Sequence, residues 1–408
     1  MKRVFITFLV LTIFGCQNQQ TTEFKITAIP SPAAENSLTP RLFTSAGGQT
    51  YLSWLERKEE KTQFKFSKFT NGNWAEPSLI SEGDNWFVNW ADFPSFIENQ
   101  GTLSAHWLQK RAAGTYDYDV RIAQSVDNGE SWSESFIPHK DDIAAEHGFV
   151  TMRPLSENQN FVTWLDGRNT KSQAHDMKDE GHGGGGAMTI RAGIFDTEGT
   201  MSADWELDAR TCDCCQTTAA ITSSGPIVAY RDRSNEEIRD IYVTKLVNDK
   251  WTTPKSVFND NWNISGCPVN GPSLSARGKF VALAWFTAAQ GFGEVKIAFS
   301  NNAGDTFGMP TLISRGNTNG RVGTTIMDNG NTVVSWMETN DDQADILLAV
   351  FNKEGQELIR RTIAQTAAAR ASGFPVISNI DNTVFMAWTE TGETSDVKTA
   401  SIDLTDTF

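Results

Sequence analysis

The chain has 408 residues, and its 50 Asp and Glu outnumber its 35 Lys and Arg, which gives a formal net charge of −15 at pH 7. No basic cluster interrupts this acidic background, which argues against binding to nucleic acid, because such a surface needs Lys and Arg to neutralise phosphates. Thirteen Trp, 25 Phe and 32 Gly, together with long stretches of alternating apolar and polar residues, favour β structure.

The N-terminus carries the pattern of a secretory signal. Lys2 and Arg3 precede an apolar run over 4–14 that is too short to span a bilayer. The Ile13-Phe14-Gly15-Cys16 segment resembles the lipobox of bacterial lipoproteins, although Phe14 is bulkier than usual. An ordinary signal peptide with a chance cysteine is the alternative. The resemblance implies a signal peptide over 1–15, a lipid on Cys16, a tether over 16–22, and a membrane-anchored cell-envelope protein that faces the periplasm or the cell surface.

The remainder, 23–408, is expected to form one domain built from an internal repeat. A strand with an aromatic residue near its end recurs seven times, at spacings of 53, 57, 66, 55, 51 and 52 residues; these aromatics are Trp54, Trp107, Trp164, Tyr230, Trp285, Trp336 and Trp388. Further short strands precede and follow each of them, and four strands at a period near 50 predict the blades of a β-propeller. We therefore expect an all-β propeller of seven four-stranded blades, with six blades as the alternative. The last unit has only three strands, so Phe24–Ile29 is predicted to supply the fourth and to close the ring.

Two turns make the resemblance more specific. The segment SVDNGESW at Ser125–Trp132 matches the Asp-box, S-x-D-x-G-x-x-W, of bacterial neuraminidase repeats, and SNNAGDTF at Ser300–Phe307 is a second copy with Asn302 in place of the Asp. The chain therefore resembles the sialidase-like propellers. In that family the Asp-box lies away from the active site, so it marks the fold and says little about chemistry.

Loops on one face of a propeller are expected to carry the function. The resemblance implies three arginines that grip a substrate carboxylate, a Tyr nucleophile activated by a Glu, and an Asp as general acid. The candidates in this sequence are Arg41, Arg231, Arg321 and Arg370 for the arginines, Asp92 for the acid and Glu236 or Glu237 for the Tyr partner. The sequence departs from the family because no Tyr lies beside Arg321 or Arg370. A structural role in bracing loops is the alternative for each arginine, while His106 is predicted in the core and His139 at the surface.

Four cysteines remain after Cys16. Cys212, Cys214 and Cys215 lie in one loop, and Cys267 occupies the same register in the next unit, because Cys212 and Cys267 each stand eighteen residues before the key aromatic. An even number of cysteines favours disulfides in an oxidising compartment, for instance Cys212–Cys267. Alternatively, these thiolates bind zinc or copper, with His182 or His147 as a further ligand. A redox-active thiol in this cluster is the third alternative. His182 belongs to an insertion over 169–186 that is either a surface loop or part of a ligand site.

Two functions follow from these patterns. In the first, the protein is a sialidase-like propeller of the cell envelope that hydrolyses or recognises an anionic glycan. In the second, it is a non-catalytic propeller that binds a metal, a glycan or a protein partner through the cysteine- and histidine-rich rim.

Overall fold

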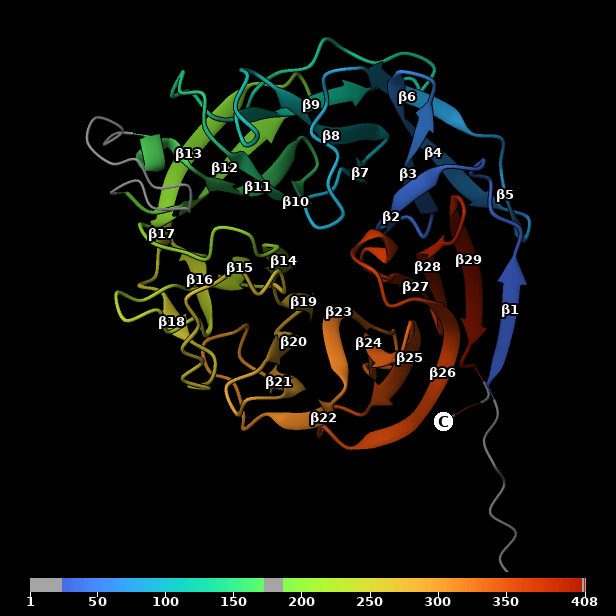
Figure 1. Cartoon of the computed structure of the whole chain (residues 1–408), viewed down its shortest axis with the longest axis vertical. Helices are drawn as coiled ribbons and strands as arrows, with labels where there is room; N and C mark the ends of the chain where they lie inside the picture. Colours follow the sequence, from blue (N-terminus) through green and yellow to red (C-terminus); the bar gives the residue numbers. More distant parts are fainter. Residues whose placement is uncertain (1–23, 172–185, 406, 408) are drawn as a thin grey trace, which may run out of the picture.

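The computed structural model describes residues 24–171, 186–405 and 407. Within these residues the backbone forms seven sheets that surround a central axis (Figure 1). The expected signal peptide, the lipidation site Cys16, the tether and His182 lie outside the described residues. No helix in the described part of the chain is long and apolar enough to cross a membrane.

Each sheet is one blade, and in blades 1 to 6 the strands follow chain order from the axis outward. Blade 1 contains β2 (Ser37–Thr44), β3 (Thr50–Lys58), β4 (Lys61–Thr70), β5 (Asn73–Trp74) and β6 (Ser78–Gly83). Blade 2 contains β7 (Ser95–Asn99), β8 (Thr102–Lys110) and β9 (Tyr118–Ser125), and a bridge between Ile122 and Phe136 stands where a fourth strand would pair. Blade 3 contains β10 (His147–Ser156), β11 (Gln159–Asp166), β12 (Thr189–Asp196) and β13 (Met201–Asp208), with the 3-10 helix η1 (Arg168–Lys171) after β11.

The second half repeats this plan. Blade 4 contains β14 (Thr218–Thr222), β15 (Gly225–Arg231), β16 (Ile241–Val247), β17 (Lys250–Trp251) and β18 (Lys255–Ser256). Blade 5 contains β19 (Ser273–Arg277), β20 (Phe280–Thr287), β21 (Gly293–Ser300) and β22 (Thr311–Gly316). Blade 6 contains β23 (Thr318–Ile326), β24 (Thr332–Asn340), β25 (Gln343–Phe351) and β26 (Glu357–Ala367), and the 3-10 helix η2 (Arg370–Ser372) follows it. With blade 7, described next, the sheets number seven, and the expectation of seven blades is confirmed.

The seventh blade joins the two ends of the described chain. Its inner strands are β27 (Val376–Ile380), β28 (Thr383–Thr391) and β29 (Ser395–Asp403), and β1 (Lys25–Ile29) pairs antiparallel with β29 as the outermost strand (Figure 1). The hydroxyl of Thr399 donates to the Ile29 carbonyl at 2.8 Å, and Trp74 of blade 1 donates its indole N–H to the same hydroxyl at 3.0 Å. The predicted closure by the N-terminal strand is confirmed.

The hydrophobic core lies between the blades. The buried apolar side chains form seven clusters, and each cluster joins two neighbouring blades. The repeated aromatics supply the largest members, because Trp54, Trp164, Trp285 and Trp336 are at most 1% exposed. Burial of apolar area at about 25 cal/mol per Å² thus stabilises the ring through every neighbouring pair of blades.

The two Asp-box-like turns fold alike. The Ser125 hydroxyl donates to Asp127 at 2.7 Å and accepts from the Gly129 amide at 2.8 Å. Ser300 makes the same two bonds, to Asn302 at 2.7 Å and from Gly304 at 3.0 Å. Asparagine can replace the aspartate because Oδ1 accepts the same bonds in both turns, and the Asn302 amide nitrogen donates to Thr306 at 2.9 Å where the second Asp127 oxygen accepts from Ser131.

Closure of the ring predicts different roles for two isoleucines of β1. Ile29 is 7% exposed and Ile26 is 41% exposed. We expect Ile29→Ala to lower the free energy of unfolding by about 2–4 kcal/mol, because it leaves a cavity in blade 7. The matched change Ile26→Ala should cost less than about 0.5 kcal/mol. Urea unfolding followed by tryptophan fluorescence measures both, and equal losses would contradict a buried closing strand.

Candidate functional site

A central channel runs between the innermost strands. Its cavity of about 150 Å³ is lined by residues from β2, β10, β14, β19, β23 and β27, from the loop before β7 and from the loops before β14, β19 and β27, among them Arg41, Asp92, Arg153, Thr218, Ser273, Thr324 and Phe374. Register shifts in β2, β10 and β23 mark bulges near the start of these strands. Such bulges re-aim side chains at the ends of sheets, which here brings polar groups to the axis.

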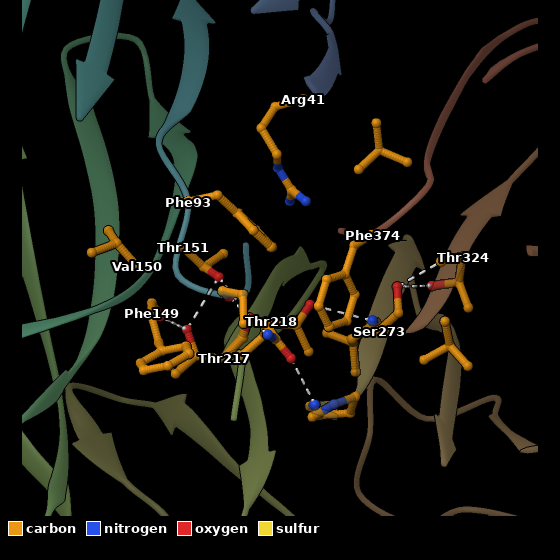
Figure 2. A pocket seen from close by; sticks show the side chains of 18 of the residues that line it. Arg41, Phe93, Phe149, Val150, Thr151, Thr217, Thr218, Ser273, Thr324 and Phe374 are labelled. Carbon is orange, nitrogen blue, oxygen red and sulfur yellow. Dashed lines mark hydrogen bonds between the residues drawn. The ribbon is translucent and has the colours of Figure 1, made fainter. Parts of the chain in front are cut away.

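Hydroxyl groups connect the inner strands around this channel (Figure 2). Thr151 donates to the Thr217 carbonyl at 2.8 Å, and Thr217 donates to the Phe149 carbonyl at 2.7 Å. Across the channel, the Ser273 and Thr324 hydroxyls lie 3.1 Å apart. These bonds link blade 3 to blade 4 and blade 5 to blade 6, so they hold the walls of the channel in place.

Two arginines of the channel have no acidic partner among residues 24–171 and 186–405. The Arg41 guanidinium stacks 4.5 Å from the centre of the Phe93 ring, and Arg153 donates to its neighbouring carbonyl, that of Met152, at 2.9 Å (Figure 2 shows Arg41 and Phe93). Burial lowers the pKa of both arginines to about 10, and for Arg41 the nearby charge of Arg153 adds to this effect. Two partly desolvated, uncompensated cations favour an anionic ligand in the channel.

A second cavity, which we call the carboxyl pocket, lies beside the channel. It measures about 240 Å³ and is lined by Phe87, Asn89, Trp90, Ala91, Asp92, Tyr116, Tyr118, Glu146, Phe149, Asp213, Cys214, Cys267, Val269 and Arg370. Ala91, Asp92 and Phe149 also line the channel, so the two cavities adjoin at these residues. The aromatic side chains offer flat apolar surfaces, whereas the polar groups are few and close together.

Tyr118 bridges two acidic side chains in this pocket. Its hydroxyl lies 2.8 Å from Asp92 Oδ2 and 3.0 Å from Glu146 Oε1. Because the hydroxyl carries one proton, it can donate to one carboxylate while it accepts a hydrogen bond from the other carboxyl group in its protonated form. Asp92 also accepts the Phe149 amide at 2.7 Å. Asp92 and Tyr118 are at most 1% exposed, and Glu146 is partly exposed to the pocket.

The pKa values of both carboxyl groups are raised into the neutral range. Burial raises the pKa of Asp92 to about 7, against the bonds from Phe149 and Tyr118 that favour its ionised form. Burial, with the neighbouring charge of Asp92, raises the pKa of Glu146 to about 8. The same burial, with both acids, raises the pKa of Tyr118 well above its usual value. A pair of acids with raised pKa values in a cleft is typical of groups that transfer protons.

Gly148 makes this arrangement possible. A Cβ atom at Gly148 would stand 2.0 Å from Asp92 Oδ2, so only a glycine lets β10 approach the carboxyl group this closely. Phe149 follows with a φ of 53°, in the left-handed region, and its amide is thereby directed at Asp92. The site therefore depends on the backbone of β10 as well as on its side chains.

The arginines that we predicted to bind a substrate carboxylate together lie apart in the structure. Arg41 lines the channel, whereas Arg321 and Arg370 line an open groove beside the carboxyl pocket. Arg321 is buried and donates to the Gly373 carbonyl at 2.7 Å. Arg231 is buried and donates to three backbone carbonyls, those of Asn270, Arg239 and Phe286. Arg231 and Arg321 thus brace loops, which is the alternative role, and Arg370 remains exposed at the pocket.

The predicted Tyr partner lies elsewhere. Glu236 is exposed and accepts a hydrogen bond from Ser234 at 3.0 Å, and Glu237 pairs with Arg233 and Arg239 at 2.7 Å. Among the described residues, Glu146, and neither Glu236 nor Glu237, is the glutamate that is hydrogen-bonded to a tyrosine, Tyr118. Glu146 and Tyr118 lie near residues that the loop pattern indicates, but nothing in the sequence reveals that blades 2 and 3 bring them together.

A second polar cluster is buried behind the pocket. The His139 and His147 rings stack at 3.7 Å, so the expectation that His139 lies at the surface is wrong; His106 is buried, as expected. His147 Nε2 lies 2.9 Å from Asp141 and 3.7 Å from Asp166, and Arg168 pairs with both acids. Burial alone would lower the pKa of His147, but these carboxylates outweigh it and raise that pKa. His147 is thus part of a charge-balanced network.

The cysteines gather at the edge of the carboxyl pocket. Cys214 forms a disulfide with Cys267, which replaces the expected Cys212–Cys267 pair, and Cys212 and Cys215 are free and buried. The sulfur atoms of Cys212, Cys214 and Cys215 lie within 4.8 Å of one another. The disulfide occupies Cys214 and Cys267, which leaves Cys212 and Cys215 as the free thiols of this cluster.

No protein-family model matches the chain, and no curated protein sequence matches it. The fold is a β-propeller with seven blades. Among solved structures, a puromycin-hydrolysing peptidase of Mycobacterium tuberculosis is 12% identical over 94% of this chain and 55% of its own, with a TM-score of 0.51. The NanB sialidase of Streptococcus pneumoniae is 8% identical over 93% of this chain and 94% of its own, with a TM-score of 0.46. An α-L-arabinofuranosidase of Fusarium graminearum is 10% identical over 94% and 99%, with a TM-score of 0.49.

The raised pKa of Asp92 predicts a dependence of stability on pH. Between about pH 4 and pH 7 the folded chain keeps a proton that the unfolded chain releases, so stability falls as the pH rises through this window. Asp92→Asn removes this loss. We expect its free energy of unfolding, relative to the wild type, to rise by about 1–3 kcal/mol between pH 4 and pH 8. Denaturant titrations at several pH values measure the difference. Asp249→Asn, on an exposed turn, is the control, and a difference that does not change with pH would contradict the raised pKa.

Proposed function

We propose that this protein is a glycoside hydrolase that cleaves an anionic glycan in the carboxyl pocket. The observation that carries the proposal is Glu146, a partly exposed carboxyl group with a pKa of about 8 that is hydrogen-bonded to Tyr118 and faces an aromatic cavity. A protonated carboxyl group at neutral pH can donate its proton to the oxygen of a glycosidic bond. The aromatic walls suit the apolar faces of a sugar ring.

Tyr118, Asp92 and Glu146 differ in how far they are exposed to the pocket, and we assign their roles on this basis. Glu146 reaches the pocket and acts as the general acid. Asp92 lies behind Tyr118 and stabilises whichever proton arrangement the hydroxyl adopts. A tyrosine with a glutamate and an aspartate is also the set of residue types that the sialidase resemblance implies.

The charge of the channel supports an anionic substrate. Arg41 and Arg153 line the channel, which adjoins the carboxyl pocket at Ala91, Asp92 and Phe149. A carboxylate or sulfate on the sugar would supply the counter-charge that these guanidinium groups lack, and planar guanidinium groups bind such oxyanions through paired hydrogen bonds. The net charge of −15 repels anions elsewhere on the surface, so the local cations define where the ligand enters.

Export to the cell envelope accords with this function. The basic and apolar N-terminal pattern that ends at Cys16 supports secretion with a lipid anchor, and the Cys214–Cys267 disulfide accords with an oxidising compartment. A hydrolase at this place would act on glycans outside the cytoplasm.

Removal of the proposed acid should abolish turnover without loss of binding. We expect Glu146→Gln to lower kcat by about 10²–10⁴-fold, because the amide cannot donate the proton, and to remove the fall of the rate above about pH 8. A panel of fluorogenic glycosides with sialic acid, uronic acid and neutral sugars provides the assay. Glu157→Gln changes an exposed glutamate and should keep the wild-type rate. Saturable binding without turnover in the wild type would instead establish the non-catalytic alternative.

The proposed anion site predicts a selective loss of affinity. We expect Arg41→Met and Arg153→Met each to raise KM for an acidic glycoside at least tenfold and to change KM for a neutral analogue less than threefold. Arg277→Met removes an exposed arginine that pairs with Asp328 and serves as the control for net charge. An equal effect on both substrates would show that the two arginines maintain the fold and do not bind the anion.

A further inference from the structure

The cysteine cluster contains both partners of a thiol–disulfide exchange. Cys214 and Cys267 form a disulfide whose Cys267 end is exposed, at the border of the carboxyl pocket and the neighbouring groove. Cys212 is 1% exposed, and its Sγ lies 3.9 Å from Cys214 Sγ. A free thiol is therefore in contact with one sulfur of a disulfide whose other sulfur faces solvent.

The surroundings of Cys212 stabilise a thiolate. Arg239 Nη1 donates to Cys212 Sγ at 3.5 Å, and both Arg239 and Arg231 are themselves buried. Burial alone would raise the pKa of Cys212, but a hydrogen bond from Cys215, the Cys214 backbone amide and the two arginines outweigh burial and lower that pKa to about 7. Burial and the charge of Cys212 raise the pKa of Cys215 well above its usual value. Two adjacent free cysteines thus differ, and Cys212 is the one suited to attack.

We propose that the four cysteines form a thiol–disulfide exchange site, in which Cys212 is the internal nucleophile and Cys267 is the sulfur presented to external thiols and disulfides. The Cys212 thiolate attacks Cys214 Sγ, the Cys212–Cys214 bond forms, the Cys214–Cys267 bond breaks, and the electron pair leaves with Cys267 as a thiolate. No electrons are gained or lost in this step. The Cys267 thiolate then attacks an external disulfide RSSR, which gives the mixed disulfide of Cys267 with RS and releases RS⁻.

This activity is independent of glycan hydrolysis, although the two sites share a wall. Cys214 and Cys267 join the loop that precedes β14 in blade 4 to the loop that precedes β19 in blade 5. After exchange, the disulfide joins Cys212 and Cys214 within the loop that precedes β14. The loop that precedes β19 is no longer cross-linked, and Cys267 is a reactive thiol on the border of the carboxyl pocket. The substrates that the geometry suits are small or flexible disulfides that can reach an exposed sulfur.

Alkylation in the absence of a reductant tests the exchange in the intact protein. The purified protein is incubated at pH 8 with N-ethylmaleimide, quenched in acid and digested with trypsin. Because trypsin cleaves after Arg210, Arg231, Lys255 and Arg277, Cys212, Cys214 and Cys215 lie in the peptide 211–231 and Cys267 lies in 256–277. A static Cys214–Cys267 bond keeps these peptides cross-linked. Exchange yields a free 256–277 peptide with one maleimide and a 211–231 peptide with an internal disulfide.

We expect the labelled 256–277 peptide to accumulate with time in the wild type and to fall at least tenfold in Cys212→Ser. Cys215→Ser keeps the nucleophile and should still yield the labelled peptide, which separates exchange from a general effect of altering the cluster. A wild-type protein whose peptides stay cross-linked and whose Cys267 stays unlabelled overturns the proposal. Elemental analysis that finds stoichiometric zinc or copper, with four cysteines that alkylate only after chelation, also overturns it, because no disulfide would then be present.

Discussion

A hydrogen bond between a buried indole and a carboxylate recurs in strands β3, β11 and β24. The arrangement of acids beside the proposed site depends on it. Trp54, Trp164 and Trp336 each donate to the acid two residues further on, at 2.7–2.9 Å. An indole N–H removed from water needs such an acceptor, since an unpaired one costs about 1–3 kcal/mol. The repeated tryptophan fills the gap between two blades, and its indole N–H needs an acceptor. In these three blades an acid at the end of the strand, beside the functional loops, is that acceptor.

This constraint decides which acids remain available for chemistry. Glu56 and Asp166 stand in the loops that the sequence marks as functional, but each is held by its tryptophan and by a cation, Lys65 or Arg168. Blade 2 lacks this bond, because Trp107, like Trp388 of blade 7, has no partner for its indole N–H among the described residues. The acids near blade 2, Asp92 and Glu146, pair through Tyr118 and keep raised pKa values. The proposed chemistry thus lies beside one of the blades that lack the indole–carboxylate bond.

The repeat made the fold predictable from the sequence. It did not make the details of the site predictable. A period near 50 residues determines the blades, the closing strand and the face on which Arg41 and Asp92 lie. The repeat period places a loop residue only to within a few positions. It therefore predicted a disulfide between Cys267 and Cys212, whereas the disulfide of Cys267 forms with Cys214. It also cannot distinguish an arginine that faces a ligand from one such as Arg231, which backbone carbonyls surround, because the acceptors carry no side-chain signature.

Pairing of β1 with β29 also constrains the order of folding. The contact between Ile29 and Thr399 joins residues 370 apart in sequence, which is nearly the whole length of the chain. Blades 1 to 6 each use strands that are consecutive in sequence and can form early, but the ring cannot close until residue 403 is free to pair. Contacts between such distant residues carry a large loop-closure cost and slow folding. An open intermediate, with β29 as an exposed sheet edge, is therefore the stage at which the chain is most prone to aggregate and at which chaperones would be most needed.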